Sequence, residues 1–156
     1  HIPFPFPWKT NEKKAEKFLE NSLKKLKKKI NLKKDVCGVV FETFQGWGAI
    51  FYPLKYVQLF AKICKKNNIL IAFDEMQAGF CRTGKKFGYE HYEVKPDLLC
   101  VGKGMGGGLP LSGVIGTSKG DSLYPCGENN CCIQNNFDDY TIWLYCIYVC
   151  ESIHFN

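Results

Sequence analysis

Apolar residues recur at helical spacing near the start of the chain and again in its middle. Over residues 11–30 they form one stripe with lysines between them: Ala15, Leu19, Leu23, Leu26 and Ile30. Such a stripe predicts an amphipathic helix with one face in the core. The same spacing over 54–66 predicts a second amphipathic helix that ends near Asn67 and Asn68, with Pro53 in its first turn.

Continuous apolar runs predict buried strands around the second helix. The run 36–41 is rich in β-branched residues and predicts a strand buried on both faces, and 69–75 predicts a second buried strand. Together with the helix they form a βαβ unit, whose strands should be parallel and whose crossover should be right-handed. Further strands are expected at 98–101 and 111–116. The fold class is therefore α/β, with a mainly parallel sheet and flanking helices.

The pattern changes after Lys119. Residues 121–156 show neither helical nor strand periodicity and are rich in Cys, Asn and Tyr. We predict one domain over 1–120 and an unassigned, Cys-rich tail over 121–156. This tail is out of frame, in error or disordered, or is a Cys-rich appendage.

No apolar run approaches the roughly 20 residues that span a bilayer, and the N-terminal stretch lacks the apolar core of a signal peptide. We therefore expect no membrane partner and a cytoplasmic location.

Positive charge is concentrated in one segment. The net charge is +6, yet residues 1–35 alone hold 11 lysines against 4 acidic residues. Lysines opposite an apolar stripe indicate a solvated helix face, and no nucleic-acid partner is expected. The alternative is a non-catalytic truncated paralogue that binds a polyanion through the Lys-rich helix over 11–30.

The nine cysteines do not predict a metal site. Cys37, Cys64, Cys81 and Cys100 are scattered through mostly apolar segments, where cysteine behaves as a small hydrophobe. The other five lie in the tail, at spacings that match no familiar ligand set.

Two glycine motifs resemble nucleotide-binding loops, but the residues around them do not match what such loops need. Residues 79–86 match G-x-x-x-x-G-K, but Lys86 stands where a magnesium-binding Ser or Thr belongs, and no amphipathic helix follows. Gly102, Gly104 and Gly107 match G-x-G-x-x-G, but the glycines and proline that follow cannot open a helix.

Asp74 and Lys103 form a more informative pair. Each follows a predicted strand, and the carboxyl ends of parallel strands meet at one edge of a sheet. Lys103 lies in a stretch otherwise almost free of charge, and an ammonium that leaves water must be paired, neutralised or bonded. Pyridoxal 5'-phosphate (PLP) needs a lysine for its Schiff base and a carboxylate on its pyridine nitrogen. The pair therefore predicts a PLP site.

Three segments resemble one family. "FETFQGWGAIFYP" (41–53), "ILIAFDEMQAGFCRTGKKFGYEH" (69–91) and "VKPDLLCVGKGMGGGLPLSGVIG" (94–116) are similar to the class III PLP-dependent aminotransferases of fold type I. The resemblance covers about residues 36–116. It implies part of the PLP-binding large domain of a homodimeric enzyme. Such an enzyme transfers an amino group, at a terminal amine of an amino acid or diamine, to a 2-oxo acid.

The resemblance also implies residue roles. Lys103 would form the Schiff base and move the proton, and Asp74 would pair with the pyridine nitrogen. Gln77 would lie beside the phenolic oxygen of the ring, and Met76 would pack on its face, where Val is usual. Glu42 resembles the gate glutamate that pairs with a substrate-binding arginine in several members.

Departures from the family concern the substrate pocket. Thr43 replaces the usual proline, and Trp47 replaces a residue that is often acidic. Gln77 favours an intermolecular transaminase over the related aminomutases, which tend to have Met there. The elements that bind the cofactor phosphate and supply the arginine are not recognisable, so the chain looks truncated and is expected to be inactive alone.

Overall fold

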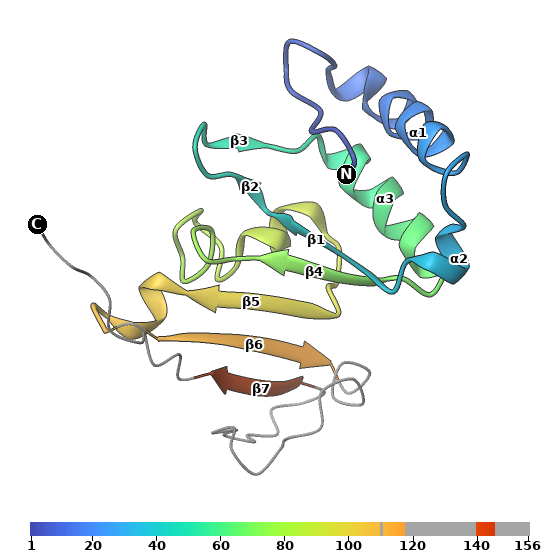
Figure 1. Ribbon diagram of the computed structural model, residues 1–156. Helices are drawn as coiled ribbons and strands as arrows, with labels where there is room; N and C mark the ends of the chain where they lie inside the picture. The colour runs from blue at the N-terminus through green and yellow to red at the C-terminus, as the bar shows by residue number, and fades with distance from the viewer. Residues whose placement is uncertain (110, 118–139, 146–156) are drawn as a thin grey trace, which may run out of the picture.

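The computed structural model describes residues 1–109, 111–117 and 140–145, and Figure 1 shows their arrangement. The elements in chain order are η1 (Glu12–Lys14), α1 (Ala15–Leu26), α2 (Leu32–Asp35), β1 (Gly38–Glu42), β2 (Phe44–Gln45), β3 (Ile50–Phe51), α3 (Leu54–Lys66), β4 (Leu70–Asp74), η2 (Gly88–Tyr92), β5 (Leu98–Gly102), η3 (Lys103–Gly106), β6 (Ser112–Thr117) and β7 (Tyr140–Tyr145).

One five-stranded sheet organises the molecule. Its strand order is β1-β4-β5-β6-β7. β1, β4 and β5 run parallel, whereas β6 is antiparallel to β5 and β7 is antiparallel to β6. α3 connects β1 to β4, so the predicted βαβ unit with parallel strands is confirmed (Figure 1). The fold is therefore α/β, as the sequence predicts.

The helices use their apolar faces as the sequence predicts. α1 packs on α3, and α3 packs against β4. Ala15, Leu19 and Leu23 of α1 are buried, and the lysines of this helix are exposed. The regular helix is shorter than the predicted 11–30, because a turn over 27–29 follows Leu26. α3 ends at Lys66 as expected, and Asn68 adopts the left-handed conformation beyond it.

Burial differs between the two parallel strands of the βαβ unit. Ile71, Ala72 and Phe73 are buried in β4, as predicted for a buried strand. The prediction that 36–41 is buried on both faces is wrong: Val40 is 70% exposed. β1 lies at the edge of the sheet. Successive side chains of a strand point to opposite faces, so Val39 and Phe41 pack on the core while Val40 does not.

Two further segments differ from expectation. Residues 44–51, for which the sequence predicts no strand, contain a two-stranded antiparallel hairpin of β2 and β3. No strand was predicted after Lys119, yet β7 pairs with β6 there. The other residues of the predicted 121–156 tail lie outside the described part of the chain.

Candidate functional site at the carboxyl edge of the sheet

Asp74 and Lys103 lie at the ends of neighbouring parallel strands. Asp74 is the last residue of β4 and is in register with Cys100 of β5. β5 ends at Gly102, and Lys103 follows it directly. Standard strand spacing puts the Cα atoms of Asp74 and Lys103 roughly 11 Å apart. One heterocyclic ring and a lysine side chain can fill that span.

The Asp74 carboxylate is half-buried and fixed by its own turn. Oδ1 accepts a hydrogen bond from the Met76 amide at 3.0 Å, and the described residues provide no donor for Oδ2. Burial, and then the charge of Asp74, raises the pKa of the neighbouring Cys100 thiol. The carboxylate therefore acts electrostatically on its surroundings and keeps one oxygen for a further donor.

Lys103 is exposed and strained. Its φ of 46° places it in the left-handed region, which costs free energy for a residue with a Cβ. Glycines flank it on both sides: a Cβ on Gly102 would meet the Met76 sulfur at 2.5 Å, whereas a Cβ on Gly104 would make an ordinary contact with Phe80 at 3.5 Å. The turn that carries Lys103 is thus packed against the 75–81 segment.

Glu42 and Gln77 meet at a third glycine. The Gly46 amide donates to Oε2 of Glu42 at 3.2 Å, and a Cβ on Gly46 would lie 2.0 Å from Oε1 of Gln77. Glu42 is in register with Asp74 across β1 and β4. Three sequence-predicted site residues, Glu42, Asp74 and Gln77, therefore lie near the ends of β1 and β4, and Met76 lies next to the Lys103 turn.

Trp47 adjoins this group. It follows Gly46, is 72% exposed, and its indole nitrogen donates to Oε1 of Gln45 at 2.6 Å. An aromatic surface replaces the acidic one that the family resemblance implies here.

Sequence reasoning missed Glu75, Phe80 and Tyr92. Glu75 is wholly buried beside Asp74, and Tyr92 is 2% exposed below the β1 end. The adjacent acids were visible in the sequence. Because side chains alternate along a strand, Asp74 and Glu75 should point to opposite faces of the sheet, and this pattern could have predicted different roles for the two carboxylates.

The residues present fit a bound PLP. A primary amine at Lys103 and a carboxylate at Asp74 are the groups that such a ring requires, and the Met76 side chain lies beside Gly102, next to Lys103.

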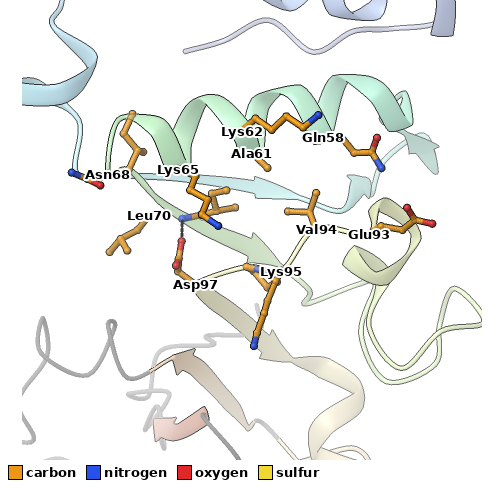
Figure 2. Close-up of a pocket in the computed structure, with 13 residues that line it drawn as sticks. Gln58, Ala61, Lys62, Lys65, Asn68, Leu70, Glu93, Val94, Lys95 and Asp97 are labelled. Atoms are coloured by element: carbon orange, nitrogen blue, oxygen red, sulfur yellow. Dashed lines mark hydrogen bonds between the residues drawn. The ribbon is translucent and has the colours of Figure 1, made fainter.

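A large groove lies elsewhere. Figure 2 shows its lining, with Lys62 and Lys65 from α3 facing the 93–97 segment. Its volume is about 1190 Å³, and it opens near the amino ends of β4 and β5. There, Oδ2 of Asp97 accepts a hydrogen bond from the Ile71 amide at 2.8 Å, so this carboxylate satisfies a backbone donor near the amino end of β4. The groove lies at the opposite end of the strands from Asp74 and Lys103.

Neither nucleotide-loop motif has its required helix. Lys86 is followed by the short 3-10 helix η2, and the Gly102 motif opens the four-residue turn η3. Among the described residues, no group of three or more His, Cys, Asp or Glu gathers as a metal site. No helix in the described part of the chain is long and apolar enough to cross a bilayer.

Comparison with known proteins identifies the family. The model of the family "Aminotransferase class-III" matches residues 1–136, a wider range than the 36–116 of the sequence resemblance. An acetylornithine/succinyldiaminopimelate aminotransferase of Buchnera aphidicola is 43% identical over 94 residues, which cover 60% of this chain and 23% of the relative. A protein of Bacillus subtilis named "Probable 4-aminobutyrate aminotransferase" is 48% identical over 85 residues, 54% of this chain and 20% of the relative.

Solved structures agree. An ornithine aminotransferase from Plasmodium yoelii matches with a TM-score of 0.60 and 35% identity, over 70% of this chain and 29% of that protein. The chain thus spans less than a third of the length of the relatives it matches. Because the family model matches most of its length, the chain belongs to the class III aminotransferases.

Proposed function

We propose that the protein containing this chain is a PLP-dependent transaminase that moves an amino group from an amino acid or diamine to a 2-oxo acid. The observation that carries this proposal is the position of Asp74 and Lys103 at the ends of adjacent parallel strands. The two residues supply the carboxylate and the amine that this chemistry needs.

Each residue has a definite task. Lys103 would hold the cofactor through its amine and, once released, move a proton to and from the substrate carbon. The Asp74 carboxylate would keep the pyridine nitrogen protonated, because a nearby negative charge favours the protonated form. When bound, PLP supplies an electron sink for the substrate carbanion. Met76 and Gln77 would orient the ring, and Glu42 would shape the substrate end of the site.

A terminal amine is the proposed donor group. Matched relatives are named for acetylornithine, 4-aminobutyrate and ornithine, and each of these compounds carries an amine on a terminal carbon. We also propose a homodimer, as the family resemblance implies, and a cytoplasmic location.

Specific labelling of Lys103 tests the proposal. The complete reading frame that encodes this chain is expressed, incubated with limiting PLP, reduced with borohydride and mapped by mass spectrometry. We expect the adduct at Lys103, and a strong loss of it in Asp74→Asn, because the ring nitrogen then loses its partner. Lys62, exposed on α3 at the far end of the strands, is the control. Equal labelling of Lys62 and Lys103 in both proteins would contradict the proposal.

Residues 1–156 alone are expected to be inactive. The elements that bind the cofactor phosphate and the substrate carboxylate are not recognisable in this segment. A transamination assay with the purified 156-residue chain and 2-oxoglutarate should therefore show no turnover. Measurable turnover would refute this expectation.

A further inference from the structure

A fully buried carboxylate lies directly behind the candidate site. Glu75 is 0% exposed and follows Asp74 in the chain. Its Oε1 accepts from the Thr43 hydroxyl at 2.5 Å and from the Tyr89 amide at 2.8 Å, and its Oε2 accepts from the Gly88 amide at 2.8 Å. Three donors offset the cost of burying this carboxylate.

The hydrogen bonds continue beyond Glu75 to a buried tyrosine. The Tyr92 hydroxyl donates to the carbonyl of Thr43 at 2.6 Å and accepts from the Tyr52 amide at 3.0 Å. Thr43 is therefore held through its side chain by Glu75 and through its backbone by Tyr92. We call this set of residues (Thr43, Glu75, Gly88, Tyr89 and Tyr92) the Glu75 network.

The network joins segments that are far apart in the sequence. Thr43 follows the end of β1, Glu75 follows the end of β4, and Gly88 and Tyr89 begin η2. The Glu75 amide also donates to the carbonyl of Cys100 in β5 at 2.8 Å. The ends of three neighbouring strands are thus fixed to one another at the edge where the candidate site lies.

Alternation along the strands connects the network to the candidate site. Phe41 and Phe73 pack in the core, and two residues further along their strands stand Thr43 and Glu75. Glu42 and Asp74 lie between, in register with each other, so their side chains belong to the opposite face. Each candidate carboxylate is therefore next in sequence to a residue locked on the core face.

We propose that Glu75 and Thr43 are positioning residues that hold the carboxylates of Asp74 and Glu42 in their working places. Thr43 stands where the family resemblance implies proline, which has no side-chain donor, so this chain adds a bond to the network. The inference rests on the proposed function for its purpose, but the positioning itself can be measured separately.

Two amides report the positions of the two carboxylates without any cofactor. The Met76 amide donates to Asp74, and the Gly46 amide donates to Glu42. Their hydrogen exchange is measured in the full protein and in three variants: Glu75→Gln, Thr43→Val and Thr43→Ser. Ser22→Ala is the control, because it removes a hydroxyl that bonds only within α1, to the Phe18 carbonyl at 2.9 Å, outside the Glu75 network.

We expect both amides to exchange faster in Thr43→Val and Glu75→Gln, and at the wild-type rate in Thr43→Ser and Ser22→Ala. PLP affinity, measured by titration of the bound chromophore, should fall about tenfold in the first two variants, the effect of one charge-assisted hydrogen bond. Urea unfolding of each variant separates this effect from a change in global stability.

The outcomes are distinct. If Thr43→Val leaves the Met76 and Gly46 amides as protected as in the wild type, the positioning inference is wrong, whether or not Glu75→Gln folds. If the wild type binds no PLP, the proposed function fails, and the exchange rates still decide the positioning inference.

Discussion

Individual cysteine thiols differ sharply in their surroundings. Cys64 of α3 is 1% exposed, and burial raises the pKa of its thiol to about 12. Cys37 and Cys81 are exposed. Because the thiolate is the reactive form, the raised pKa makes the Cys64 thiol much less reactive than an exposed one at pH 8.

Alkylation should therefore distinguish these residues. In brief treatment of the folded chain with iodoacetamide at pH 8, we expect Cys37 and Cys81 to be modified and Cys64 to remain free, as read by peptide mass spectrometry. In 8 M urea the protection of Cys64 should disappear. Labelling of Cys64 at the rate of Cys37 in the folded chain would show that α3 does not pack as described.

At the residue scale, the sequence predicts which side chains can carry chemistry better than it predicts their burial and hydrogen-bond partners. Asp74 and Lys103 were found because their residue types and their places after apolar runs are visible in one dimension. The burial of Glu75 cannot be predicted in the same way, because its hydrogen-bond donors Thr43 and Gly88 are 32 and 13 residues away in the chain. The strain at Lys103 likewise depends on the turn that packs against Met76 and Phe80.

The basic helix offers a test at the scale of one element. Leu19 is 0% exposed within the contact between α1 and α3, whereas Lys17 is exposed. Truncating a buried leucine loses its transfer free energy and leaves a cavity, which costs about 2–5 kcal/mol. An exposed lysine contributes within about 0.5 kcal/mol.

We expect Leu19→Ala to lower the free energy of unfolding in urea by about 2–5 kcal/mol, and Lys17→Ala to leave it nearly unchanged. Equal effects of the two variants would mean that α1 is not docked on α3 through its apolar stripe.

Elements were predicted from periodicity with uneven success, for a physical reason. α3 and β4 have one dominant pattern each, and their predicted bounds agree closely with the observed ones, whereas α1 is shorter than the predicted 11–30 and α2 was not predicted. β1 has an apolar run as continuous as that of β4, yet Val40 is exposed. A strand's place in the sheet order decides whether both its faces are covered, and that order is a property of the whole fold.

At the scale of the whole molecule, several large apolar side chains remain exposed. Trp8, Val40, Trp47 and Leu109 are each at least 67% exposed. The chain spans less than a third of its relatives' length, and exposed apolar surface favours association. We therefore expect the isolated 156-residue chain to bind the dye ANS in its folded state, as fluorescence would show. Fluorescence no higher than that of a free-dye control would contradict this expectation.

The tyrosine-rich core couples folding to alkaline pH. Burial raises the pKa of Tyr56 to about 12 from its ordinary value of 10.0, and that of Cys64 to about 12 from 9.0. Burial also raises the pKa of Tyr52 and of Tyr92. For Tyr52, the neighbouring Tyr56 and Tyr92 raise the pKa further. Below about pH 8 these groups are almost wholly protonated in both the folded and the unfolded chain, so they cause little pH dependence there.

Above pH 9 the unfolded chain loses these protons while the folded chain retains them, so the stability falls as the pH rises toward 12. We expect the urea midpoint to decrease steadily from pH 9 to pH 11. Tyr56→Phe should weaken that dependence, because it removes one titrating group whose hydroxyl makes just a 3.5 Å contact with the Pro3 carbonyl. A midpoint that is constant between pH 8 and pH 11 would mean that these hydroxyls and the Cys64 thiol are in contact with solvent, and that the core is open where the structure has it closed.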